Sequence, residues 1–195
     1  MKILALETSC DDTCAAVIDD RAAIRSNVIS SQRAHDRFGG VVPEIASRHH
    51  LELVNIVVEQ ALAEADTALD EVDRVAVTQG PGLIGALLVG LSTAKALAAA
   101  RKLPLVPVDH LQGHVAANFL VPGDGGPPFE PPFVCLIASG GHTLLAHVSD
   151  HERFDTLGRT LDDAAGEAFD KGARMLGLGY PGGPALERLA AEGDP

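Results

Sequence analysis

The chain has 195 residues, and 46% of them are hydrophobic, which is enough to bury one or two cores. Its 27 acidic and 15 basic side chains give a net charge of -12, so a broad basic surface that would hold bare nucleic acid is excluded. Aromatic residues make up only 4% of the chain. The cores must therefore be built from Leu, Val, Ile and Ala, a composition that favours a β/α protein with buried parallel strands.

In chain order, hydrophobic alternation first predicts three consecutive strands, at residues 2–7, 14–19 and 23–30. A long helical pattern then begins at Pro43, a residue tolerated in a first helical turn, and runs to about residue 65. Three further elements follow: a strand at 74–78, a helix at 85–100 and a strand at 103–108. The order βββαβαβ is typical of the RNase-H-like half of the actin, Hsp70 and sugar-kinase superfamily.

The second part of the chain begins after residues 122–132, whose glycines and prolines indicate a linker. It repeats the opening meander, with strands predicted at 133–138, 143–148 and near 154–158. A helix comes next, and its periodicity predicts a buried stripe of Leu161, Ala165, Ala168, Phe169 and Leu176. Another helical stretch runs from about residue 184 to Pro195, where we expect this second sheet to be unfinished.

These elements predict an α/β protein with the actin-like ATPase (ASKHA, RNase H-like) fold. We expect a first lobe at 1–109, a candidate metal-binding helix and linker at 110–132, and an incomplete second lobe at 133–195.

Cysteine usage and hydropathy predict a cytoplasmic protein. The three cysteines are an odd number, no signal peptide is recognisable, and no apolar stretch is expected to span a bilayer. Lys95 interrupts the apolar helix at 85–100, which we expect to pack as core. The spacing of Cys10 and Cys14 has no matching second half, so it does not predict a metal site.

His110 and His114 form the most informative pattern, because they follow the predicted strand at 103–108 directly. Residues four apart share a helix face, so both imidazoles could hold one metal ion at a strand's carboxyl end, where open α/β sheets bind ligands. Chance is the competing interpretation: His147 and His151 have the same spacing, but they lie on either side of a strand end. Two histidines leave a divalent ion undersaturated, so a carboxylate, water or substrate oxygen must complete its shell.

Two glycine turns are candidate anion-binding sites. Residues 78–85 link a strand to a helix, which suits an anion, although Gly80-Pro-Gly82 is equally explained as a tight turn. Ser139-Gly-Gly-His142 joins two strands, and a β-hairpin alone would explain it equally well. Its position in a second meander, equivalent to Thr8-Ser-Cys-Asp-Asp12 in the first, indicates two lobes that grip one nucleotide.

Six motifs occur in order from Met1 to about Gly183: Glu7-Thr-Ser-Cys-Asp-Asp12, Phe38-Gly-Gly-Val-Val-Pro-Glu-Ile-Ala-Ser-Arg48-His49, Gly80-Pro-Gly-Leu-Ile-Gly85, His110-Leu-Gln-Gly-His114, Ser139-Gly-Gly-His-Thr143 and Asp162-Asp-Ala-Ala-Gly-Glu-Ala-Phe-Asp-Lys171. Together they resemble the TsaD family of tRNA N6-adenosine threonylcarbamoyltransferases, formerly labelled O-sialoglycoprotein endopeptidases. The resemblance implies transfer of a threonylcarbamoyl group from threonylcarbamoyl-AMP to N6 of the adenosine 3′ to a tRNA anticodon.

The resemblance also implies roles for individual residues. His110 and His114 match two ligands of a divalent metal ion, iron or zinc, whose third ligand, an aspartate, would lie beyond Pro195. The matches to adenylate-binding positions are Ile137, Ala138, Ser139, Gly140, Gly141, Asp170 and Gly183. Asp11 matches an acidic residue near the phosphate region and is a candidate catalytic residue. From the residues alone, Asp170 would instead belong to a solvated polar helix face with Asp163, Glu167 and Arg174.

The partners that the resemblance implies are tRNA, a TsaB-type paralogue and the associated ATPase TsaE, with no membrane. We expect the helices at 44–65 and 85–100 to pair with that paralogue or with a second copy, and this chain alone to be inactive. Two alternatives remain open, a noncatalytic TsaB-like scaffold and an ASKHA-type small-molecule kinase. The family usually has Glu where this chain has Gln112, which argues further against a protease.

Overall fold

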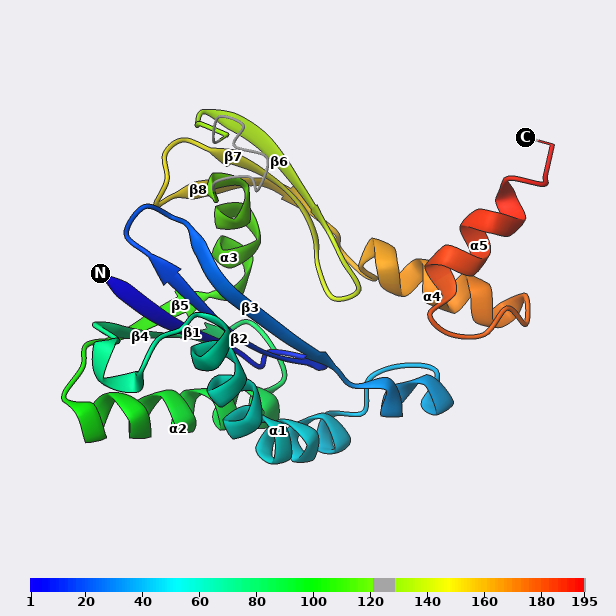
Figure 1. Cartoon of the computed structure of the whole chain (residues 1–195). Helices are drawn as coiled ribbons and strands as arrows, with labels where there is room; N and C mark the ends of the chain where they lie inside the picture. Colours follow the sequence, from blue (N-terminus) through cyan, green and yellow to red (C-terminus); the bar gives the residue numbers. More distant parts are fainter. Residues whose placement is uncertain (121–128, 195) are drawn as a thin grey trace. The chain divides into compact units, whose positions relative to one another are not determined.

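The computed structural model describes residues 1–120 and 129–194, so most of the predicted linker lies outside the described residues (Figure 1). The chain divides into two compact units. The first consists of Met1–Arg33 and Val41–Phe129, and the second of Ala34–Gly40 and Glu130–Pro195. The lobe boundaries expected from the sequence stay a prediction.

The first unit is built on a five-stranded sheet with the order β3-β2-β1-β4-β5. Its strands are β1 (Lys2–Glu7), β2 (Asp12–Asp19), β3 (Ile24–Ser31), β4 (Arg74–Gly80) and β5 (Leu105–Asp109). The first three form an antiparallel meander, whereas β4 pairs parallel with both β1 and β5. The two long helices are α1 (Pro43–Glu64) and α2 (Ile84–Arg101). The predicted order βββαβαβ is confirmed.

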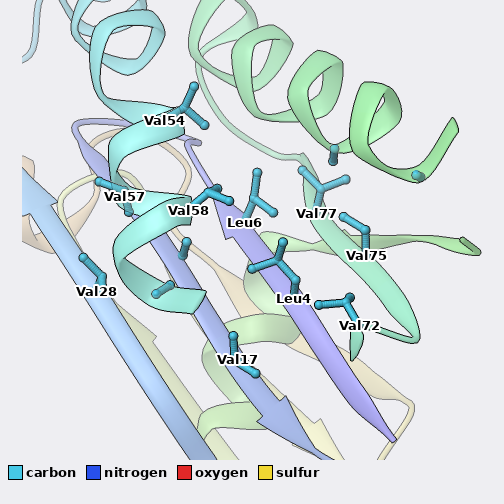
Figure 2. Close-up of a cluster of buried hydrophobic side chains, with 14 residues drawn as sticks. Leu4, Leu6, Val17, Val28, Val54, Val57, Val58, Val72, Val75 and Val77 are labelled. Atoms are coloured by element: carbon cyan, nitrogen blue, oxygen red, sulfur yellow. The ribbon is translucent and has the colours of Figure 1, made fainter. Parts of the chain in front are cut away.

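Alternation along β1 divides the sheet into two different faces. Leu4 and Leu6 are almost fully buried and point into an aliphatic core to which α1 contributes valines, as Figure 2 shows. Helices α1 and α2 cover this face (Figure 1). Ala5 and Glu7 have the opposite orientation because successive strand residues alternate, and they line the face that α3 (His110–Ala116) borders.

Helix α2 packs through a stripe of small residues. Ala86, Gly90, Ala94 and Ala98 are buried at intervals of four and let the helix approach the sheet closely. By length and composition, α2 is nevertheless the one helix in the described part of the chain that could cross a membrane. The expectation that no apolar stretch is long enough to span a bilayer is therefore wrong for α2, because the single charge of Lys95 does not lower the mean hydropathy of the helix enough. The expected core packing is seen along the stripe.

The second unit contains a three-stranded antiparallel sheet with the order β6-β7-β8. Its strands are β6 (Phe133–Ala138), β7 (Thr143–Val148) and β8 (Phe154–Arg159), followed by the helices α4 (Ala165–Met175) and α5 (Gly182–Ala190). The predicted second meander is confirmed. Alternate residues of β7 are buried on one face: Leu144, Ala146 and Val148.

The predicted buried stripe of the first helix in this unit is wrong. Leu161 precedes the helix and is fully exposed, and the described residues Ala168, Phe169 and Leu176 are exposed too, while Ala165 is half-buried. Helix α4 packs instead through its small residues, with Ala173 fully buried. Apolar spacing shows that a helix has an apolar face but does not show which face its neighbours cover.

Candidate metal and nucleotide sites

The histidine pair lies where parallel strands end at a common edge of the sheet. Leu6 pairs with Val77 and Gly80 with Asp109, so the carboxyl ends of β1, β4 and β5 are neighbours. The Asp109 carboxylate then accepts hydrogen bonds from the backbone N–H groups of Leu111 and Gln112, at 2.9 and 3.0 Å. This N-cap starts α3 directly after β5 and so places both histidines at the edge.

His110 and His114 lie on one face of α3, as their spacing predicts. Their Nε2 atoms are 3.1 Å apart, and the ring centroids are separated by 4.6 Å. Two imidazole nitrogens at 2.0–2.1 Å from one tetrahedral zinc ion would be separated by about 3.3 Å, so the pair fits two ligands of a single ion. Among the residues that the structure describes, no group of three or more His, Cys, Asp or Glu side chains could hold a metal. Metal binding itself stays a prediction.

A carboxylate that the sequence analysis did not single out supports His110. Glu7 Oε2 lies 3.1 Å from His110 Nδ1 and accepts a hydrogen bond of 2.6 Å from Thr78 Oγ1, while Oε1 accepts one from the Ser9 amide. Burial alone would raise the pKa of Glu7, but the hydrogen bonds from His110, Thr78 and Ser9 outweigh burial and lower it to about 2. Through the same bond, Glu7 raises the pKa of His110 above its usual value, against the opposing effect of burial.

Helix α2 fixes the turn that follows β1. Thr8 Oγ1 donates to the Ala86 carbonyl at 2.9 Å and accepts from the Gly90 N–H at 3.2 Å. The Leu83 N–H donates to the Ser9 carbonyl, and a Cβ atom at Gly82 would lie only 2.6 Å from that oxygen. These contacts favour close packing over anion binding as the reason for glycine in this turn, because the Leu83 amide is already engaged.

Helix α1 holds the same turn through a fully buried histidine. His50 Nε2 lies 3.0 Å from the Cys10 carbonyl, and its Nδ1 lies 2.8 Å from Thr13 Oγ1. A carbonyl can only accept, so Nε2 carries the proton and Nδ1 accepts from the Thr13 hydroxyl. Burial disfavours the imidazolium form and lowers the pKa of His50. The turn that bears Ser9 is therefore anchored to both covering helices.

A cavity of about 320 Å³ opens beside the histidine pair on the α3 face of the sheet. Its floor is made by small strand residues such as Ala5, Ala16 and Ala76, and its wall includes His110 and His114. The small side chains leave room over the strands for an apolar group.

Cys10 and Asp11 lie in the turn after β1, and Cys14 lies in β2. The Asp11 carbonyl accepts from the Gln32 N–H, and its carboxylate lies beside Cys10. Partial burial, with the nearby carboxylates of Asp12 and Glu7, raises the pKa of the Cys14 thiol to about 12. A catalytic role for Asp11 stays a prediction.

The predicted adenylate turn of the second unit is closed by its own backbone and by α4. The Ser139 N–H donates to the His142 carbonyl at 2.8 Å, and the Gly166 N–H donates to the Ser139 carbonyl at 3.1 Å. A Cβ atom at Gly166 would lie 2.9 Å from Gly140, so the helix approaches the turn very closely. No atom of the described residues lies within 4 Å of the Cβ positions of Gly140 and Gly141, which leaves their outer side open in this part of the structure.

The other adenylate candidates lie along the same helix. Asp170 follows Gly166 by one helical turn, and its carboxylate accepts from the Gly182 N–H at 2.7 Å, next to Gly183. Asp170 is half-buried, whereas Glu167 and Arg174 are exposed, so the polar face of this helix is solvated only in part. One face of α4 thus holds both the glycine turn and the start of α5. Ala138 ends β6 with an exposed side chain, whereas Ile137 is buried and can offer a ligand only its backbone.

His147 and His151, which have the same spacing as the candidate pair, occupy ordinary structural positions. His147 lies within β7, and His151 pairs with Glu130 at 3.1 Å in the following turn.

A family model for "TsaD: tRNA N6-adenosine threonylcarbamoyltransferase" matches residues 23–195. Curated relatives of that name include one from Clostridium novyi (strain NT), 55% identical over 195 residues, and one from Clostridium perfringens (strain SM101 / Type A), 56% identical over 193 residues. These matches cover 100% and 98% of this chain but 56% of each relative. The chain thus spans little more than half the length of the relatives it matches.

Solved structures are similar at the level of the fold. YeaZ from Pseudomonas aeruginosa aligns with a TM-score of 0.52 and 19% identity, over 81% of this chain and 65% of that one. Ethanolamine utilization protein EutJ from Carboxydothermus hydrogenoformans aligns with a TM-score of 0.52 and 15% identity, over 96% and 60%. These likenesses agree with the actin-like fold that the element order predicts. With most of its length matched by the family model and by relatives of about 55% identity, the chain belongs to the TsaD family.

Proposed function

We propose that this chain supplies the histidine pair and the adenylate-binding turn of an enzyme that transfers threonylcarbamoyl from threonylcarbamoyl-AMP to tRNA. The observation that carries the proposal is the convergence of His110 Nε2 and His114 Nε2 at 3.1 Å, in a chain of this family. The amine at N6 of adenosine attacks the carbamoyl carbon, and AMP leaves.

Each unit has a proposed role in that reaction. His110 and His114 would hold an iron or zinc ion, which supplies Lewis-acid polarisation of the reacting group when bound. The turn at Ser139–Gly141 would receive the phosphate of the adenylate, because its two glycines leave the backbone accessible. Asp170 would fix the start of α5, next to Gly183, beside the nucleotide.

Partner proteins are part of the proposal, because the net charge of -12 opposes direct binding of tRNA. Helices α1 and α2 lie side by side and expose large apolar residues: Leu51, Ile56, Ile84 and Leu88. Exposed apolar side chains on these two helices support docking of a TsaB-type paralogue or a second copy, with TsaE as a further partner. The likeness of this chain's fold to YeaZ, over 81% of its length, is in keeping with a paralogous pair.

The proposal is tested in a chimera, because the chain covers 56% of its relatives. Residues 1–195 replace the aligned part of the Clostridium novyi relative, and threonylcarbamoyl transfer to tRNA is measured with the partner proteins. We expect activity in the chimera and its loss when His110 and His114 are both replaced by Ala. The matched control replaces His147 and His151, which have the same spacing, and should remain active. Full activity without His110 and His114 would refute the proposed role. The 195-residue chain alone should be inactive.

A further inference from the structure

Glu7 is a half-buried carboxylate at the end of β1 whose oxygens all have defined partners. Its Oε2 receives the Thr78 hydroxyl at 2.6 Å and lies 3.1 Å from His110 Nδ1, and its Oε1 receives the Ser9 amide. These partners come from β4, from α3 and from the turn after β1, which are far apart in sequence. A carboxylate held in this way cannot turn away from His110 without breaking bonds to two other elements.

The bond between Glu7 and His110 decides which imidazole nitrogen carries the proton. A carboxylate at neutral pH can only accept, so His110 Nδ1 must donate. In neutral His110 the lone pair then lies on Nε2, the atom 3.1 Å from His114 Nε2. Free imidazole side chains in water favour the opposite tautomer, with the proton on Nε2. The lone pair is thus presented on the nitrogen that a shared ion would need.

Ser9 reinforces the same orientation. Its hydroxyl oxygen lies 3.2 Å from His110 Nδ1, and its carbonyl and amide are fixed by Leu83 and Glu7. Because the turn is also tied to α1 through His50, the acceptors around Nδ1 are held by rigid elements.

We propose that Glu7 is the positioning residue of the histidine pair: its carboxylate keeps the proton of His110 on Nδ1 and thereby presents Nε2, with His114, to a divalent cation. The inference rests on the proposed function only in treating the pair as a metal site. Thr78 acts one step further out, by fixing the carboxylate oxygen that receives the His110 proton.

The first experiment measures cation affinity of the 195-residue chain. Co²⁺ is titrated and followed by its visible absorption, and Zn²⁺ affinity is obtained by competition. Replacement of Glu7 by Leu should weaken binding by about 10- to 100-fold, the usual effect of losing a hydrogen-bond partner of a ligand. Glu7→Gln keeps an acceptor oxygen and should recover part of the affinity, and Thr78→Val should show a smaller loss. The matched control is Glu71→Gln, because Glu71 binds Lys2 at the opposite end of β1; it should leave affinity unchanged.

The second experiment reads the tautomer directly, without metal. Side-chain ¹⁵N NMR of the folded chain, above the pKa of His110, should show the proton on Nδ1 in the wild type and a shift toward Nε2 in Glu7→Leu. If Glu7→Leu does not fold, Thr78→Val should give the same shift to a smaller extent. An unchanged tautomer would overturn the proposal. If the wild type shows the Nδ1 proton but binds neither cation, the assignment of the histidine pair as a metal site fails. If the tautomer and cation binding are as expected but the unmutated chimera has no transferase activity, the proposed function fails and the role of Glu7 stands.

Discussion

The two units contain the same three-stranded meander but support it differently. In the first, β1 to β3 continue into parallel strands, and a core of 14 buried residues fills the space beneath α1 and α2 (Figure 2). In the second, β6 to β8 bury Leu144, Ala146 and Val148, while Leu136 and Leu145 on the other face are exposed. A shared strand order therefore does not determine how firmly a meander is packed, since that depends on what covers it.

The turn after β1 and the turn after β6 also differ in how many contacts hold them in place. The turn after β1 is fixed by side chains and close packing from two helices, through Thr8, His50 and Gly82. The turn after β6 is closed by its own backbone and by one helix, and its two glycines are open on the outer side. The first arrangement suits a rigid support for protein ligands, and the second suits a backbone that receives a substrate.

Removing one leucine from each sheet gives the largest expected contrast. Leu4 is fully buried, so Leu4→Ala should cost about 2–5 kcal/mol in free energy of unfolding. Leu136 is 65% exposed, so Leu136→Ala should cost about 0.5 kcal/mol or less. Urea unfolding of both variants measures the difference. Equal costs would mean that the face of Leu136 is covered in solution.

Adding one methyl group to each turn should give the next largest contrast. A Cβ atom at Gly82 would meet the Ser9 carbonyl at 2.6 Å, so Gly82→Ala should cost about 1–3 kcal/mol. The methyl group of Gly140→Ala meets no described atom within 4 Å, so this variant should change stability by about 0.5 kcal/mol or less. Thermal unfolding would distinguish them, and an equally destabilised Gly140→Ala would contradict an open outer side.

One helix from each unit, α5 and α1, offers a third comparison. Asp170→Ala removes the acceptor of the Gly182 N–H and should weaken the start of α5 by about 1 kcal/mol. Amide hydrogen exchange should then accelerate in residues 182–190 and stay unchanged in α1. Acceleration in both helices would show that the two units unfold together.

The smallest expected effect is a change in stability at acidic pH, caused by His50 beside the turn after β1. Burial holds its folded pKa below the unfolded value of about 6.5, opposed by the Cys10 carbonyl and by nearby carboxylates. The stability contributed by neutral His50 is therefore fully present above about pH 6.5 and falls as the pH drops below that value. His50→Gln should reduce the slope of stability against pH in that window. A slope identical to that of the wild type would show that His50 does not titrate with unfolding.

Local pattern was sufficient to predict most of the fold. The bounds of β1, β6 and β7 agree with the alternation of their residues, and α1 begins at Pro43 as expected. Strand β2 begins two residues earlier than predicted, because Asp12 continues the ladder with Ser31. Pairing with a partner strand is not visible in the strand's own sequence.

The candidate site could be predicted only where it is local. His110 and His114 are four residues apart on one helix, so their shared face follows from spacing alone. Glu7, by contrast, meets Thr78 and His110 across 71 and 103 residues. Its place as the last residue of a strand at the carboxyl edge was the available signal, but only the parallel pairing of β1 with β4 brings these side chains together.

The hydroxyl of Thr8 makes hydrogen exchange at one amide of α2 sensitive to the turn after β1. It bridges the Gly90 N–H and the Ala86 carbonyl, two groups that an α-helix joins directly. The exchange of one amide in the middle of α2 therefore depends on a residue of the neighbouring strand end. Isotope labelling of Gly90 would thus allow loosening of the turn beside the histidines to be detected from within the helix, even while the rest of that helix stays intact.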